Sequence, residues 1–311
     1  MRIAKTLLLA TLLLVASSSN AQYVWDFGVK LGAANYLGDI GGGAGAARGF
    51  VYDMKLDQTR FNLGASARYF FGNKTAVSLH FTQARLKGED ASSENPERYS
   101  RNLSFRNDVL ELSTRLEYHF IQINDVGRTF RYRLSFSMFL WGGVGAFYNN
   151  PKGYYEGEWV ALRPLATEGT NYGAFAFCAP AGVGMHYRFN KRHLIGFEAG
   201  WRFTMSDFID DVSGFYVNPD DFSSPQALAL SDRSVEVDPN DPLFIGSQFY
   251  GAGTKANPVE PAKRGNPEDN DSYLLASFTY SYALRGKTLF SRSRYRFVKG
   301  RPKRRRSKAK F

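Results

Sequence analysis

The chain has 311 residues, one cysteine and a formal net charge of +11 at pH 7. A single cysteine excludes an intrachain disulfide and argues against a cysteine-based metal cluster or cysteine catalysis. The charge is unevenly distributed: residues 285–311 carry +13 without an acidic residue, Arg2 and Lys5 add +2, and the remaining chain therefore carries −4. A basic segment on an acidic body indicates that the partner of this segment is acidic.

The first 21 residues have the pattern of a secretory signal peptide. Arg2 and Lys5 precede an apolar stretch over residues 6–16, and Ser19 and Ala21 are small residues at the −3 and −1 positions of a cut after Ala21. We therefore predict a signal peptide over residues 1–21. An uncleaved anchor is the alternative, but the apolar stretch is shorter than the roughly 20 residues that a spanning helix needs.

Eight later segments alternate apolar and polar residues with the period of two that is typical of β-strands. They cover residues 25–33, 61–71, 77–82, 110–120, 130–147, 175–189, 195–204 and 274–284. In the clearest of them, Leu112 and Leu116 share one face while Glu111 and Glu117 share the other. The mean hydropathy of −0.35 does not exclude a membrane protein, because only every second residue of a barrel strand faces lipid.

The connectors between these segments alternate in length. Short ones cover residues 72–74, 121–129 and 190–191, and long ones cover residues 38–58, 88–104, 148–172 and 207–271. This alternation and the even strand count predict an all-β fold, an eight-stranded antiparallel transmembrane β-barrel over residues 22–284. The long loops would be extracellular, and both termini would lie on the periplasmic side of the outer membrane.

Aromatic residues support this prediction, because barrel strands carry aromatic girdles at the membrane interfaces. Every strand that runs toward the periplasm in this arrangement ends in two aromatic residues on its apolar face: Tyr69 and Phe71, Tyr118 and Phe120, Tyr187 and Phe189, Tyr280 and Tyr282. The alternative is a soluble, secreted β-sandwich or lipocalin-like barrel, in which the apolar face would point inward. Strands of about 10 to 16 residues and connectors sorted by length favour the membrane barrel.

The interior of an eight-stranded barrel is filled by its own side chains. We predict that charges on the polar faces pair inside the lumen as a plug, so that no diffusion pore exists: Arg68, Glu111, Arg115, Glu117, Arg131, Arg133, Glu198 and Arg202. An enzyme at the barrel rim would need a histidine beside a nucleophile, and only His80 with Ser78 or Thr82 is placed for this. Lumen packing is favoured, so we expect no catalytic residues and no cofactor.

The connector over residues 206–272 holds 13 acidic and 4 basic residues. Asp207, Asp210 and Asp211 are weak candidates for Ca²⁺ ligands, but the spacing of a calcium loop is absent, and a solvated acidic loop is favoured. A connector of this length either folds over the barrel mouth or is partly disordered.

Residues 285–311 form a basic tail with interleaved aromatic residues. The residues that we predict to bind an acidic partner are Arg285, Lys287, Arg292, Arg294, Tyr295, Arg296, Phe297, Arg301, Lys303, Arg304, Arg305 and Arg306. A secretory signal argues against nucleic acid, which leaves an acidic periplasmic protein surface as the favoured partner. Anionic lipid head groups and a merely solvated tail are the alternatives.

Three stretches carry a resemblance to a known family: residues 27–40, residues 207–216, and residues 264–267 with Asp269, Asp271 and Tyr273. They resemble PorG-type outer-membrane β-barrel proteins of the type IX secretion system, a DUF6089-like family. The resemblance implies a non-enzymatic barrel that anchors or stabilises a periplasmic ring of a PorK-like lipoprotein and a PorN-like protein at the outer membrane. Relatives without a secretion role could share these motifs, and a ligand-binding or transport barrel or a rim enzyme stay as alternatives.

Overall fold

The computed structural model describes residues 23–42, 54–71, 74–126, 132–189, 192–222, 224–246 and 262–285. The predicted signal peptide and the tail beyond Arg285 lie outside the described residues, as do residues 247–261 of the acidic connector.

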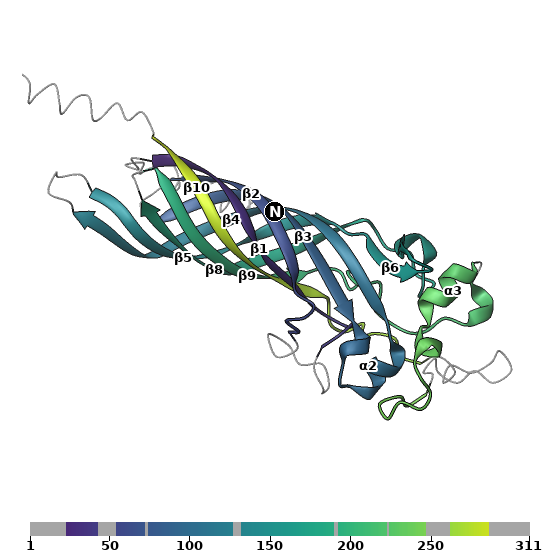
Figure 1. The fold of residues 1–311 in the computed structure, drawn as a ribbon. Helices are drawn as coiled ribbons and strands as arrows, with labels where there is room; N and C mark the ends of the chain where they lie inside the picture. Colours follow the sequence, from purple (N-terminus) through teal and green to yellow (C-terminus); the bar gives the residue numbers. More distant parts are fainter. Residues whose placement is uncertain are drawn as a thin grey trace, which may run out of the picture.

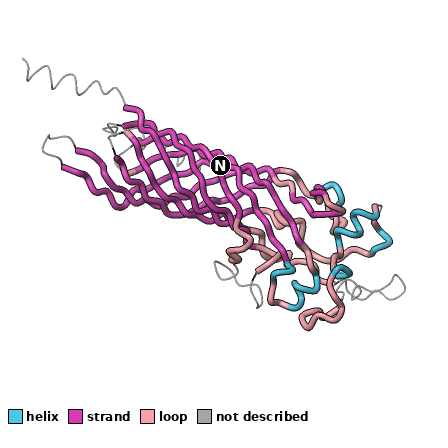
Figure 2. Tube along the Cα trace, in the orientation of Figure 1, coloured by secondary structure: helices cyan, strands magenta, loops and turns pink. Residues whose placement is uncertain are grey.

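All eight predicted strands are present. They are β1 (Tyr23–Leu37), β2 (Arg60–Phe70), β3 (Thr75–Glu89), β4 (Ser104–Val126), β5 (Tyr132–Tyr148), β8 (Phe175–Phe189), β9 (His193–Thr204) and β10 (Ser272–Arg285). Each pairs antiparallel with its neighbours, β1 pairs with β10, and β3 pairs with β4, so the eight strands close into a barrel (Figures 1 and 2). Closure removes the free edges of the sheet, which is a requirement for strands that cross a lipid bilayer.

One predicted turn is wrong. Residues 121–126, expected to lie in a short connector, extend β4 and pair with β5 from Ile121↔Met138 to Val126↔Tyr132. The strand continues because the pairing passes a register shift between His119 and Ile121, which leaves both Phe120 and Ile121 exposed. The last β3 partner of β4 is Tyr118, so this ribbon projects beyond the barrel at the short-turn end (Figure 1).

The polarity of the barrel wall is that of a membrane protein. On β4, Leu112 and Leu116 are 53% and 56% exposed, whereas the alternating Glu111 and Glu117 are each 1% exposed. The soluble alternative is wrong, because its apolar face would point into the barrel. An exposed apolar belt around a charged interior is stable only when lipid covers the belt, so the chain has the architecture of a small outer-membrane β-barrel.

The aromatic residues predicted at the short-turn end lie on the outer wall. Tyr118, Phe120, Tyr187, Phe189 and Tyr280 are between 39% and 50% exposed. This is the position of an interfacial girdle, where an aromatic ring has both apolar and polar surroundings.

The long connectors contain most of the remaining structure. Two further strands, β6 (Pro151–Tyr155) and β7 (Glu158–Ala161), form a hairpin. The hairpin is joined to the barrel because β6 pairs with β4. The helices are α2 (Pro96–Arg101) and α3 (Pro225–Ser231), with 3₁₀ turns η2 (Asp90–Ser92), η3 (Arg163–Leu165), η4 (Pro219–Asp221) and η5 (Ser234–Glu236). Helix α2 begins at Pro96 because Asn95 accepts a hydrogen bond from the Glu97 amide as its N-cap. Among the described residues, no helix is both long and apolar enough to cross a membrane.

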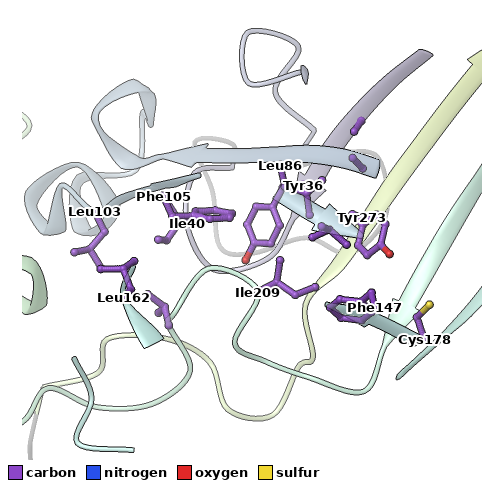
Figure 3. Close-up of a cluster of buried hydrophobic side chains, with 14 of the residues drawn as sticks. Tyr36, Ile40, Leu86, Leu103, Phe105, Phe147, Leu162, Cys178, Ile209 and Tyr273 are labelled. Atoms are coloured by element: carbon purple, nitrogen blue, oxygen red, sulfur yellow. The ribbon is translucent and has the colours of Figure 1, made fainter. Parts of the chain in front are cut away.

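The hydrophobic core lies at the long-loop mouth rather than along the barrel axis (Figure 3). Tyr36, Leu86 and Tyr273 come from the strand ends, while Ile40 and Ile209 come from the connectors. All five are at most 4% exposed. The connectors therefore cover the mouth as a packed cap, because apolar side chains from the strands and the loops bury one another.

Candidate functional site in the barrel lumen and the mouth cap

The lumen holds a balanced set of buried charges. The cations are Lys30, Arg68, Arg115 and Arg202, the acids are Asp26, Glu111, Glu117 and Glu198, and each is at most 5% exposed. They come from four of the eight barrel strands, β1, β2, β4 and β9, where alternate residues point inward. Among these most buried side chains, four cations face four acids, so their charges balance.

Glu198 on β9 is the central acceptor of this network. Its Oε1 lies 3.3 Å from Arg68 Nη2, and its Oε2 lies 3.5 Å from Arg115 Nη1 and also accepts from Lys30 Nζ. One carboxylate therefore contacts three cations that belong to β1, β2 and β4. A buried charge with this many partners avoids the cost of an unpaired ion in a low-dielectric interior.

Two further carboxylates extend the network toward both ends. Glu117 forms an ion pair with Arg68, whose Nε lies 2.6 Å away, and it accepts a hydrogen bond from Ser78 Oγ at 2.5 Å. Toward the mouth, Glu111 lies 3.3 Å from Arg202 Nε and accepts from the Tyr273 hydroxyl at 3.0 Å.

Trp141 on β5 packs among the cations of the same network. The Arg115 and Arg202 guanidinium carbons lie 4.2 Å and 5.4 Å from the centre of its ring. The cavity that Trp141 and these charges line has a volume of about 10 Å³, which is room for about one water molecule. Through its described residues the lumen is therefore a solid plug rather than a channel.

The structure places six of the eight predicted lumen charges inside the barrel: Arg68, Glu111, Arg115, Glu117, Glu198 and Arg202. Arg131 lies outside the described residues, and Arg133 belongs to β5. Sequence reasoning missed Asp26 and Lys30, although both lie on the polar face of the first alternating segment. That alternation was the signal that could have identified them.

His80, the one histidine considered for catalysis, is 1% exposed inside the lumen. Its Nε2 lies 2.8 Å from Ser78 Oγ, and this hydroxyl donates to Glu117. A nucleophile needs a space beside it for the reacting atom of a substrate. His80, Ser78 and Glu117 are each 1% exposed, so these contacts are buried inside the lumen.

The mouth cap is organised around the Tyr36 hydroxyl. It lies 2.7 Å from Asp210 Oδ2 and also contacts Asp271 Oδ1, and its oxygen accepts from the Asp39 amide at 3.1 Å. One phenolic proton serves only one carboxylate at a time, so two carboxylates beside the same hydroxyl favour a proton on the Asp210 and Asp271 pair. Burial, with the like charge of neighbouring carboxylates, raises the pKa of both aspartates well above the usual range.

Backbone amides complete the coordination of these two acids. Asp210 accepts from the Ile40 and Val212 amides at 3.1 Å and 2.9 Å, and Asp271 accepts from the Ile209 amide at 2.9 Å. The start and the end of the acidic connector are thereby joined to the end of β1.

A second group in the cap surrounds Asp211, which has a φ of +72°. Its carboxylate accepts from the Thr167 and Tyr172 hydroxyls, the latter at 2.5 Å, and burial raises its pKa to about 6. Arg264 donates to Glu168 at 2.9 Å and to the Asp211 carbonyl at 2.7 Å, which ties this group to the connector after β7. Burial raises the pKa of Asp207 to about 7.

These contacts correct the expectation of a solvated acidic loop in this part of the connector. Asp210, Asp211 and Asp271 are at most 2% exposed and act as buried acceptors that hold the cap together. The weak calcium candidates Asp207, Asp210 and Asp211 do not converge: within the described ranges, no three acidic, histidine or cysteine side chains form a group that could hold a metal ion. The sequence could not reveal this, because the donors come from connectors distant in the chain.

The predicted tail site begins where the described structure ends. Arg285 is the last residue of β10 and pairs with Tyr23 of β1, so β1 begins and β10 ends at the short-turn end. The remaining predicted partner-binding residues lie outside the described residues: Lys287, Arg292, Arg294, Tyr295, Arg296, Phe297, Arg301, Lys303, Arg304, Arg305 and Arg306.

A family model described as "Domain of unknown function (DUF6089)" matches residues 5–232, and no curated protein matches the chain. Among solved structures, the chain is similar to the outer membrane protein OprG from Pseudomonas aeruginosa, with 11% identity, a TM-score of 0.38 and coverage of 86% of this chain and 99% of that one. It is also similar to Ail, the attachment invasion locus protein of Yersinia pestis, with 10% identity, a TM-score of 0.34 and coverage of 84% and 98%. At these scores the similarities add nothing to the architecture that the strand pairing establishes.

Proposed function

The chain belongs to the DUF6089 family, whose description leaves its function open, and we propose that it is a non-enzymatic outer-membrane component of a type IX protein secretion machine. In this proposal the barrel anchors or stabilises a periplasmic ring, built from a PorK-like lipoprotein and a PorN-like protein, at the outer membrane. The basic tail makes the contact, and both termini face the periplasm. The secretion role comes from the resemblance of the three sequence stretches.

The observation that carries the proposal is the segregation of charge. The described part of the lumen is closed and balanced, with four cations facing four acids, so the barrel interior offers neither a path nor an electrostatic attraction to a solute. The +13 of residues 285–311, in contrast, begins at the short-turn end where β10 stops. A long basic segment at one rim favours binding to an acidic surface there, and the barrel limits the search for that surface to two dimensions.

The test is a pulldown from membranes at physiological salt with three forms of the protein. Deletion of residues 286–311 should release the ring proteins, and so should a tail of the same length in which every Lys and Arg is Gln. A third form carries a tail with the same residues in shuffled order. It should still bind the ring if binding depends on charge alone, and it should lose the ring if binding depends on the order of the residues. Unchanged recovery of the ring after deletion would contradict the proposal.

A photo-reactive residue at Tyr295 or Phe297 gives the contact directly. Crosslinks to ring proteins support the proposed anchor, whereas crosslinks to lipid alone indicate that the tail lies on the membrane surface. The same residue placed at Tyr154, an exposed β6 residue at the opposite end of the barrel, is the matched control and should capture no ring protein.

A further inference from the structure

A row of three cations crosses the outer wall of the barrel at the long-loop end. Lys87 on β3 lies directly opposite Arg106 on β4, and Arg106 lies directly opposite Lys152 on β6. Directly opposed residues of antiparallel strands share one face of the sheet, so the three side chains lie side by side. Adjacent strands are about 4.8 Å apart, and the cation row therefore spans about 10 Å.

This row lies where the apolar belt ends. Below it on the same outward face of β3 and β4, Phe81, Leu110 and Leu112 are 52%, 40% and 53% exposed. Above it, the exposed Tyr154 and Trp159 rings of the β6–β7 hairpin pack at 5.4 Å from each other. Apolar residues below and aromatic residues beside a charged row indicate the depth of the lipid head groups.

The cations of the row exceed the acids beside them. Arg106 Nη2 lies 3.2 Å from Asp108, which Arg85 also contacts at 2.5 Å, and Lys87 pairs with Glu89. Arg85, Lys87, Arg106 and Lys152 thus face two acids, and no described acidic side chain forms an ion pair with Lys152. Lys87 and Arg106 are each 27% exposed, so both remain accessible to a ligand.

Like charges directly opposite each other on adjacent strands destabilise a sheet. The cation row has two such contacts in succession, which is an arrangement that an anion between the side chains would stabilise. Trp159 holds the middle cation in place, because its ring centre lies 5.1 Å from the Arg106 guanidinium carbon.

We propose that Lys87, Arg106 and Lys152 form a binding site for the anionic phosphate headgroup of a membrane lipid in the leaflet at the long-loop end. The acyl chains lie against Phe81, Leu110 and Leu112, and the phosphate oxygens accept from the three cations. The inference is independent of the secretion role, since the tail leaves the barrel at the other end.

The experiment uses the full chain refolded in zwitterionic detergent and titrated with diphosphoryl lipid A, with thermal unfolding as the readout. Lipid that binds the folded barrel raises the unfolding midpoint with concentration. The variant K87Q/K152Q removes two cations of the row but leaves the contacts of Arg106 with Asp108 and Trp159 in place. Each cation near a lipid phosphate contributes about fivefold to affinity, so this variant should bind on the order of 25-fold more weakly. K87R/K152R, which keeps both charges, should bind as the wild type does.

Two comparisons separate the proposed site from weaker explanations. K263Q, the control for K152Q, removes one cation from the cap and should leave lipid binding unchanged. Without anionic lipid, K87Q/K152Q should unfold at or above the wild-type midpoint, because the like-charge contacts are gone; with lipid it should unfold below it. If K87Q/K152Q fails to refold, K152Q alone, with an expected fivefold loss, takes its place. Equal lipid affinity of variant and wild type, or equal protection by inorganic phosphate, would overturn the proposal.

Discussion

The lumen and the mouth cap both bury carboxylates, but they neutralise them in different ways. In the lumen, Glu198 contacts three cations and Glu117 contacts Arg68, so charge is balanced by opposite charge. In the cap, Asp210 and Asp271 share the Tyr36 hydroxyl and otherwise accept from backbone amides. Ion pairs hold the lumen together, whereas the cap is held by hydrogen bonds that depend on a protonated carboxyl group.

The difference follows from what each region must do. Strands in a bilayer have a fixed register, so side chains of opposite charge can be placed opposite one another with little freedom to separate. The cap is built from connectors with few regular hydrogen bonds of their own, and its acids satisfy backbone amides that would otherwise be buried without partners. The comparison predicts a rigid barrel and a cap whose stability depends on protonation.

The largest expected effect is in the lumen. Replacing Glu198 with Gln leaves Lys30, Arg68 and Arg115 without their shared acceptor. Removing one partner from a buried ion network costs about 3–5 kcal/mol, because the remaining charges stay buried. The free energy of unfolding, measured by urea titration of the refolded barrel in detergent, should fall by this amount.

The matched control for this substitution is Glu97→Gln at the first turn of α2, which removes an acid that has no ion pair among the described residues. It should change the free energy of unfolding by less than about 0.5 kcal/mol. A loss for Glu198→Gln as small as that of the control would mean that the lumen charges are solvated, and the solid plug would then be wrong.

The second prediction concerns the shared hydroxyl of the cap. Tyr36→Phe keeps the ring in the hydrophobic core but removes the donor to Asp210 and Asp271, at a cost of about 1–3 kcal/mol for the unsatisfied acceptors. We expect faster proteolytic cleavage and amide exchange in residues 207–216 with the barrel strands unchanged. Tyr99→Phe is the control, since its hydroxyl donates to Asp241 at 2.8 Å outside the buried core. Equal cleavage in both variants would contradict the role of Tyr36.

Raising the pH from 5 to 8 should have a smaller, graded effect on the cap. Burial raises the pKa of Asp211 to about 6 and that of Asp207 to about 7, from the ordinary value of 3.8. A raised pKa in the folded state means that stability is complete below about pH 4 and is lost as the pH rises through 6 to 7. The full loss for Asp211 is about 3 kcal/mol, of which about 1.5 kcal/mol falls between pH 5 and pH 8.

Amide exchange of residues 207–216, corrected for the intrinsic pH dependence of exchange, measures this effect at pH 5 and pH 8. The barrel strands are the internal control, because the lumen acids are paired with cations. Asp211→Asn should reduce the difference between the two pH values, since the amide does not titrate. A cap that becomes more protected at pH 8 would show that the sign of the dependence is wrong.

The sequence predicted the lumen well and the cap poorly, for a physical reason. A period of two places Glu111, Arg115 and Glu117 on one face without knowledge of any partner, because closure of the sheet makes that face the interior. The burial of Asp210 depends instead on its hydrogen bonds with Tyr36 and the Ile40 amide, which are about 170 residues away in the chain. Local composition indicated a solvated loop there, and only the folded connectors show that these acids are buried.

The smallest expected effect tests whether acidic content alone holds the cap. Glu236 belongs to the same connector as Asp210, is 48% exposed at its side chain and pairs with Arg233 at 2.8 Å. Exposed ion pairs of this kind contribute at most about 1 kcal/mol, so Glu236→Gln should change the free energy of unfolding by less than about 0.5 kcal/mol. The pH dependence of exchange in residues 207–216 should also stay as in the wild type. If Glu236→Gln instead loosened the cap as Tyr36→Phe does, the total charge of the connector, rather than its buried hydrogen bonds, would be the stabilising feature.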